Sequence, residues 1–169
     1  HVSNFRPVKR VEDVVDGDWS PDGRRIAFVR WALQKGHVVS IIGVAAGDGG
    51  GAHEVGRVED YGLIHPRWSP DGRTIASAQG RGTTASRALS SIFLASADGG
   101  PVRVIAAPRM RQDLSSVAWS GQDEVVYAQA QNVTSAASGA ARILRQDVRT
   151  GEIRSTLWSP NSSQVFALL

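Results

Sequence analysis

The chain has 169 residues, of which 41% are hydrophobic and 21% charged, and these proportions are typical of a folded globular domain. It contains no cysteine and no run of about eighteen apolar residues, so the sequence excludes disulfides and thiolate chemistry and predicts no membrane insertion. The formal net charge is only +3 and the arginines are scattered along the chain, so we expect no nucleic-acid partner.

The first motif of the chain is Trp-Ser-Pro-Asp-Gly-Arg at residues 19–24, and it follows a short strand-like segment at residues 5–11. Pro presets φ for the first corner of a tight turn, Asp can accept a hydrogen bond from its own backbone, and Gly takes a position with positive φ. The motif therefore predicts the bend of a β-hairpin, with Trp19 closing the strand before it.

Three further strands are predicted after this bend. Apolar segments at residues 24–31 and 38–46 are separated by a short loop, and residues 54–58 follow a glycine-rich stretch at residues 47–51. That stretch is predicted to be a turn and not a phosphate-binding loop, because neither a helix N-terminus nor a Lys-Ser/Thr pair follows it.

The same six letters recur at residues 68–73, and a degenerate third copy, Trp-Ser-Gly-Gln-Asp, stands at residues 119–123. The third turn is predicted to be one residue shorter, which places Tyr127 where Phe28 stands in the first copy. A fixed period of about 50 residues marks a repeat architecture. The motif residues are accordingly interpreted as structural: Trp19, Pro21, Asp22, Gly23, Trp68, Pro70, Asp71, Gly72 and Trp119.

Four short antiparallel strands per repeat predict an all-β fold, a β-propeller of four-stranded antiparallel blades. The predicted domain spans residues 1–169, with units centred on 19–58, 68–106 and 119–157. Segments 5–11 and 164–169 are predicted to be spare outer and inner strands of neighbouring units, and Trp158 is placed just after the last outer strand. About three blades are thus present, and they are predicted to be part of a larger ring of, for example, six blades.

These blades cannot close a ring alone, because propellers use about four to eight of them. Two arrangements remain open at this point. Either two chains form a homodimer that completes the ring, or a longer native chain supplies the missing blades.

Variable polar residues on the predicted inner strands are the candidates for lining a binding channel: Asp18, His65 and Arg67. The equivalent tripeptides, residues 16–18, 65–67 and 116–118, differ in character between units. No Gly-x-Ser-x-Gly elbow is present, and the four histidines are dispersed. We therefore expect no enzymatic activity, no metal site and no cofactor.

Trp-Ser-Pro-Asp-Gly-Arg followed by Ile-Ala-Phe, a later Ile-Phe-Leu strand and Asp-Gly-Gly resembles the repeat of TolB-type, WD-like β-propellers. The resemblance covers essentially the whole chain and implies a recognition scaffold, with a protein or peptide partner and a periplasmic or other extracytoplasmic location in bacteria. It leaves two alternatives: a sensor propeller of a bacterial kinase or regulator, and the gating propeller of a prolyl-oligopeptidase-like hydrolase.

Overall fold

The computed structural model describes residues 13–59, 62–79, 91–106, 112–131 and 141–159. Within these ranges the chain forms β-strands and turns but no helix, and so no helix that could span a membrane. The strands predicted at residues 5–11 and 164–169 lie outside the described residues. The all-β fold class is confirmed.

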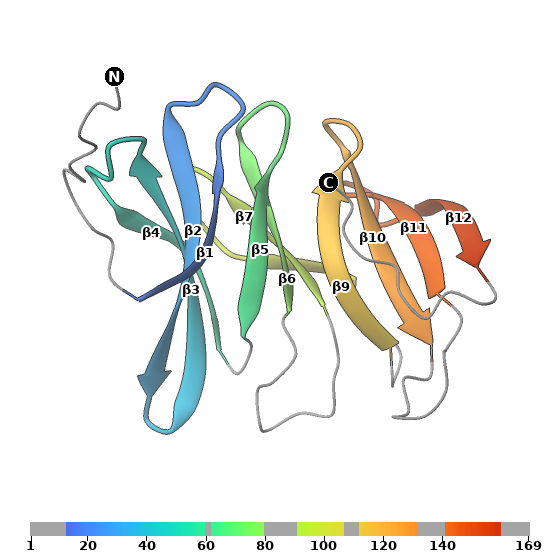
Figure 1. Ribbon diagram of the computed structural model, residues 1–169, viewed down its shortest axis with the longest axis horizontal. Coiled ribbons are helices and arrows are strands. Elements are labelled where there is room, and N and C mark those ends of the chain that lie inside the picture. The colour runs from blue at the N-terminus through green and yellow to red at the C-terminus, as the bar shows by residue number, and fades with distance from the viewer. Residues whose placement is uncertain (1–12, 60–61, 80–90, 107–111, 132–140, 160–169) are drawn as a thin grey trace, which may run out of the picture.

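Three four-stranded antiparallel sheets lie side by side along the long axis of the molecule (Figure 1). In each sheet the strands are hydrogen-bonded in chain order, which is the connectivity of a propeller blade. The first sheet contains β1 (Val14–Trp19), β2 (Arg25–Gln34), β3 (His37–Ala46) and β4 (His53–Glu59). The second contains β5 (Leu63–Trp68), β6 (Thr74–Gln79), β7 (Ile92–Ser96) and β8 (Arg103–Ala106). The third contains β9 (Gln112–Trp119), β10 (Glu124–Gln131), β11 (Ala141–Asp147) and β12 (Ile153–Ser159).

Each motif forms the turn between the first two strands of its sheet. In the first copy the Ser20 hydroxyl donates to Asp22 Oδ1 over 2.6 Å, and the same oxygen accepts the Arg24 backbone N–H over 3.1 Å. Gly23 has φ +68°, a conformation that glycine adopts without a steric cost. The second copy repeats this geometry, since the Ser69 hydroxyl donates to Asp71 Oδ1 over 2.6 Å.

The third turn replaces the missing aspartate with a carboxylate from the next strand. Here the Ser120 hydroxyl donates to Glu124, which also binds the Arg145 guanidinium. The register confirms the shorter turn, because Val117 pairs with Tyr127 as Gly17 pairs with Phe28.

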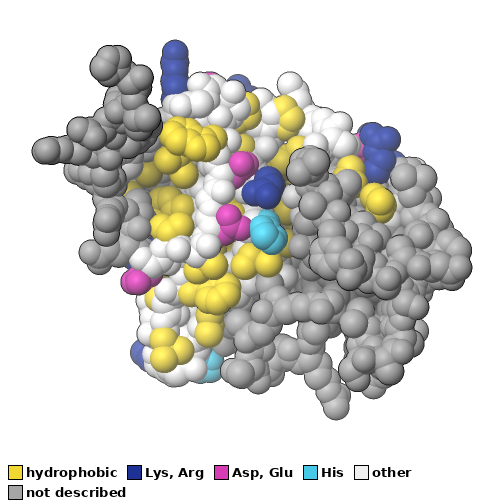
Figure 2. Space-filling view, viewed as in Figure 1, with side chains coloured by type: hydrophobic (Ala, Val, Ile, Leu, Met, Phe, Trp, Pro, Cys, Tyr) yellow, Lys and Arg dark blue, Asp and Glu magenta, His cyan; other side chains and the backbone are white. Residues whose placement is uncertain are grey.

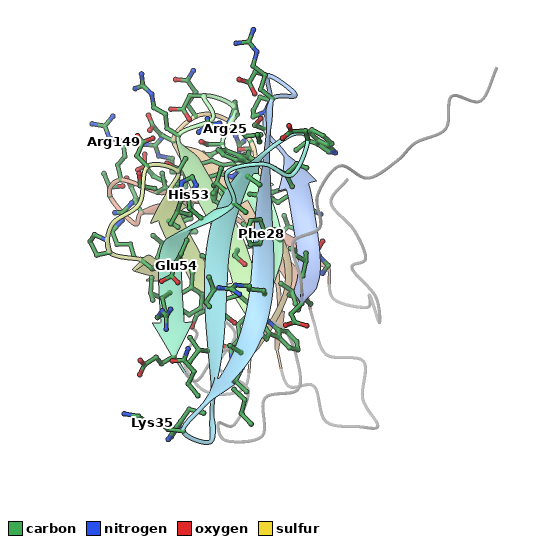
Figure 3. The ribbon with its side chains drawn as sticks, turned by 90° about the vertical axis from the view of Figure 1, so that its left-hand side faces the viewer. Arg25, Phe28, Lys35, His53, Glu54 and Arg149 are labelled. Carbon is green, nitrogen blue, oxygen red and sulfur yellow. The ribbon has the colours of Figure 1, made fainter. Side chains whose placement is uncertain are left out.

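Two strand ends differ from the prediction. β2 runs on to Gln34 because only Lys35 and Gly36 form the following turn, with φ values of 51° and 85°, as expected of a two-residue hairpin turn. This hairpin tip is at the bottom of Figure 3. Trp158 lies within β12, paired with Arg142, and not just beyond the last outer strand as predicted.

Two apolar cores hold the three sheets together, one at each junction between neighbouring sheets. The first core lies between sheets one and two and contains, among others, Val29, Ile42, Trp68, Ile75 and Phe93. The second lies between sheets two and three and contains Ala76, Ile92, Leu94, Val125 and Tyr127. Alternate residues of β6 and β7 therefore face opposite cores, so the middle sheet is buried on both faces.

One aromatic ring occupies the same level of every sheet, opposite a smaller residue on the neighbouring strand. Phe28 on β2 lies across from Gly43 on β3, so closely that a Cβ on Gly43 would stand 2.2 Å from the ring (Figure 3). In the second sheet the positions are exchanged, with Ser77 on β6 opposite Phe93 on β7. The first two sheets thus place one ring opposite a small residue at this level, with the ring on β2 in the first sheet and on β7 in the second.

Candidate functional site

The first strands of the sheets, β1, β5 and β9, lie next to one another and are the inner strands of the partial propeller. Each is an edge strand and each carries a register irregularity. In β5 the irregularity lies between Ile64 and Arg67, so His65 and Pro66 form a bulge. Pro66 has no N–H to give to a ladder, and proline in a sheet is confined to edge strands and bulges.

His65 has a left-handed backbone, with φ 53°, and its two donors converge on one carboxylate. Its backbone N–H donates to Asp16 Oδ2 over 3.0 Å, and its Nδ1 lies 2.8 Å from the same oxygen. The other carboxylate oxygen, Oδ1, accepts the N–H of Gly17 over 2.8 Å. Asp16 on β1 therefore joins the inner strands of two sheets and satisfies the N–H that the bulge removes from the ladder.

Asp18, the next candidate, also acts across this junction. Its Oδ2 accepts the Trp68 backbone N–H and its carbonyl accepts the Trp68 indole N–H, both over 3.1 Å. The carboxylate is half-buried and its position is set by these bonds. Its role in the described structure is to dock the second motif on the first sheet.

Arg67 is the third candidate, two residues along β5 from His65. It is half-buried, and its guanidinium donates to the Pro66 carbonyl over 3.0 Å. Among the described residues it has no carboxylate partner. The guanidinium has five N–H donors, so it retains most of its capacity to bind an acceptor.

Acidic, basic and histidine side chains gather near the middle of the face shown in Figure 2, over the inner strands. Asp16 was not among the residues singled out from the sequence. A signal for it was present, because Asp16 and His65 occupy equivalent inner-strand positions, as do Asp18 and Arg67. Equivalence alone does not predict contact, because Asp16 and His65 meet across the junction whereas Arg67 has no carboxylate partner among the described residues.

The tryptophans of the motif connect consecutive sheets in the same way. The Trp68 indole N–H donates to the carbonyl of Asp18, and the Trp119 indole N–H donates to the carbonyl of Arg67 over 2.9 Å. In both cases the acceptor is the residue immediately before the tryptophan of the preceding motif. The candidate residues Asp18 and Arg67 therefore supply their main chain to the scaffold, and only their side chains differ between repeats.

The motif carboxylates are held in their ionised form by donors of the turn. The hydrogen bond from the Ser69 hydroxyl, together with the Arg73 backbone N–H, lowers the pKa of Asp71 below its ordinary value of 3.8. The Ser20 hydroxyl and the Arg24 backbone N–H lower the pKa of Asp22 in the same way. These carboxylates stabilise turns, and their chemistry is that of acceptors.

The described residues contain no group of three or more His, Cys, Asp or Glu side chains arranged to hold a metal ion. The glycine-rich stretch at residues 47–51 forms a turn that leads directly into β4. Its Asp48 accepts the Gly50 N–H over 2.8 Å, a local turn contact.

No family model matches the chain, and no curated protein sequence is significantly similar to it. Among solved structures, it is similar to the β-propeller domain of the Trilobed protease from Pyrococcus furiosus, with a TM-score of 0.62 and 16% identity over 87% of this chain and 43% of that one. Oligogalacturonate lyase in complex with manganese gives a TM-score of 0.63 and 16% identity over 88% and 44%. A putative TolB from Agrobacterium tumefaciens gives 0.59 and 20% over 92% and 53%.

The fold is therefore a partial β-propeller, and the predicted resemblance to TolB-type propellers is confirmed at the level of fold. The chain spans less than half the length of the first two of these structures and about half of the third. The proteins carrying this fold differ widely in activity, so the fold itself assigns no function.

Proposed function

We propose that the chain is a non-catalytic recognition scaffold that binds a protein or peptide partner through the face formed by its inner strands. The observation that carries this proposal is the state of Arg67. Its guanidinium is half-buried beside the bulge of β5 and has no carboxylate partner among the described residues. Both neighbouring carboxylates already accept hydrogen bonds from the scaffold.

A guanidinium with free donors recognises planar anions, because its N–H groups match the two oxygens of a carboxylate. We therefore expect the partner to present an Asp or Glu side chain, or a C-terminal carboxylate, to Arg67. The Asp16–His65 pair beside it keeps the strand at the required position, since it joins β1 to β5.

The test is to pan a display library of random dodecapeptides against the full chain and to measure the enriched peptides by fluorescence anisotropy. We expect acidic peptides that bind about 10- to 100-fold more weakly to Arg67→Gln, the usual effect of losing a hydrogen bond to a charged group. Arg149→Gln is the matched control, because this exposed arginine lies on the turn after β11 (Figure 3). Failure to enrich any peptide, or binding that Arg67→Gln leaves unchanged, would overturn the proposal.

The non-catalytic part of the proposal has its own test. We expect no turnover of peptide or ester substrates by the purified chain. Turnover that survives repurification and is lost on substitution of a single Ser or His would contradict it.

A second candidate function is that of a gating propeller for a serine hydrolase. It is favoured by the similarity to prolyl oligopeptidase B from Galerina marginata, which has a TM-score of 0.55 and 12% identity over 92% of this chain and 24% of that one. A Gly-x-Ser-x-Gly motif in the same open reading frame would favour this function, and an open reading frame without one would count against it.

A further inference from the structure

The two ends of the row of sheets carry complementary halves of the contact that joins the sheets inside the molecule. At both internal junctions a motif tryptophan donates its indole N–H to the carbonyl of the residue before the preceding motif tryptophan. The acceptors, Asp18 and Arg67, have the same register, since they pair with Ala27 and Ala76 respectively. The contact therefore depends on the repeat geometry and not on side-chain identity at the acceptor.

At one end of the row, Trp19 has the indole N–H donor of this contact but no acceptor for it among the described residues. Its side chain is 55% exposed, whereas Trp68 at the first junction is 5% exposed. Among the described residues its indole nitrogen has no hydrogen-bond partner. Val14 pairs with Arg30 as Gly17 pairs with Phe28, so both lie on the same face of the sheet, and Val14 is 41% exposed. This face of the first sheet is therefore exposed at Trp19 and Val14 on its inner strand, whereas Phe28 and Ile41 on the same face are buried.

At the other end of the row, the Ala118 carbonyl is in the position of the acceptor of this contact. Ala118 precedes Trp119 and pairs with Val126, so its carbonyl has the register of Asp18 and Arg67. β9 is an edge strand, and the described residues contain no fourth sheet to supply a donor.

A cation accompanies the acceptor at this end, as at the first junction. There the Arg25 guanidinium lies 4.6 Å from the centroid of the Trp68 ring and donates to the Gly72 carbonyl over 2.8 Å. Glu124 follows the third turn as Arg25 follows the first, and it binds the guanidinium of Arg145, whose side chain is 49% exposed. The third sheet therefore offers both a carbonyl and a cation to a tryptophan such as Trp19.

We propose that a second copy of this chain docks its first sheet on the third sheet of the first copy, with Trp19 of each copy donating to the Ala118 carbonyl of the other. A second copy fits because one chain carries both halves of the contact. Repeating the same head-to-tail contact twice closes a two-fold ring of six sheets. The sizes of the similar structures are consistent with such a ring, because one copy of this chain spans 43% and 44% of the length of the first two.

The test is sedimentation equilibrium of the full chain from about 1 to 100 μM. The expected species is a dimer of the 18.0 kDa chain. Trp19→Phe keeps an aromatic ring but removes the indole N–H together with the pyrrole part of the side chain, and it is expected to raise the dimer dissociation constant about 5- to 100-fold, because one hydrogen bond is lost at each of two interfaces. Trp68→Phe makes the same change at an internal junction and is expected to lower the melting temperature without a comparable effect on dimerisation.

A double-mutant cycle between Trp19→Ala and Arg145→Ala tests the contact itself. The two substitutions are expected to weaken the dimer less than additively, because each removes the same contact. A monomer at every concentration, polymers that grow without limit, or a dimer that Trp19→Phe and Trp19→Ala leave unchanged would each overturn the proposal.

Discussion

The guanidinium of Arg25 lies over the ring of Trp68 and at the same time donates a hydrogen bond to the main chain of the turn that follows this tryptophan. One side chain at the start of β2 thereby fixes the motif of the next sheet. Thr74 follows the second turn as Arg25 follows the first. Because threonine has no guanidinium, the cation–π contact of the first junction is not repeated from this position at the second.

Substituting Arg25 with Ala should therefore destabilise the fold at the first junction. We expect a loss of about 1–2 kcal/mol, from one hydrogen bond and one cation–π contact that are both partly shielded from water. Urea denaturation measures the change. Arg24→Ala is the matched control, since this neighbouring side chain is exposed. Equal losses for the two variants would contradict the role assigned to Arg25.

Valine at Gly72 should destabilise the domain by about 1–3 kcal/mol, because a β-branched residue must then adopt φ +68°. Gly23→Val imposes the same backbone strain at φ +68°, but no heavy atom lies within 4 Å of its Cβ, whereas Arg25 lies 3.4 Å from a Cβ on Gly72. Gly72→Val should thus cost at least as much as Gly23→Val. Gln122→Val in the degenerate third turn should cost much less. Thermal melts that show equal losses at positions 72 and 122 would mean that the repeats are misaligned.

Alanine at Gly43 should be destabilising by about 1–3 kcal/mol, because its Cβ would overlap the Phe28 ring. Phe28→Leu should reduce that cost when the two substitutions are combined, since the smaller side chain leaves room for the added methyl group. The third sheet already accommodates an aromatic opposite an alkyl group, Tyr127 and Leu144. Chemical denaturation of the two single variants and the double variant gives the coupling energy, and strict additivity would contradict direct contact.

The turns and their strands could be predicted from the sequence because their causes are local. Pro21, Asp22 and Gly23 specify one bend by backbone preference alone, and the same letters recur at the second turn. The contacts between sheets could not be predicted in this way. The acceptor for Trp68 is a main-chain carbonyl in the preceding repeat, and any residue at position 18 would supply it. The exchange of Phe28 and Phe93 between strands likewise appears only when neighbouring strands are aligned.

The strands that carry the candidate residues could be predicted, whereas the contacts of these residues could not. Asp18, His65 and Arg67 were placed on inner strands, and β1 and β5 do carry them. The pairing of Asp16 with His65 depends on the bulge at Pro66, which changes the register and frees the His65 N–H. A bulge of this kind arises from pairing between strands and is not specified by either strand alone.

Acid should destabilise the motif turns. The pKa of Asp71 is lower in the folded chain than its ordinary value of 3.8, so its contribution to stability is present above that value and is lost as the pH falls through the folded pKa. We expect the free energy of unfolding to fall below about pH 4. Asp71→Asn should make this fall shallower, and Ser69→Ala should do so in part, because the Ser69 hydroxyl is the main cause of the lowered pKa. Urea denaturation between about pH 2 and pH 5 measures the slope, and unchanged slopes in both variants would contradict this assignment.

The strained backbone of His65 gives the last prediction, which concerns the candidate site itself. A residue other than glycine at φ 53° costs free energy, and such residues persist only where surrounding contacts hold them. Asp16 makes the contacts that hold His65 in this conformation, because its Oδ2 binds both the backbone N–H and the Nδ1 of His65. His65→Ala keeps the strain and loses the imidazole contact, whereas His65→Gly loses the contact and relieves the strain.

We therefore expect His65→Ala to be less stable than His65→Gly by about 1 kcal/mol. Asp16→Asn keeps an oxygen acceptor but removes the charge, so it should destabilise the wild-type chain more than it destabilises His65→Gly. Chemical denaturation of these variants supplies the comparison. If alanine proves as stable as glycine at position 65, the backbone there is not strained. The bulge would then be held by Pro66 and the strand pairing alone. The Asp16–His65 pair would then be available for binding a ligand, because the fold would not depend on it.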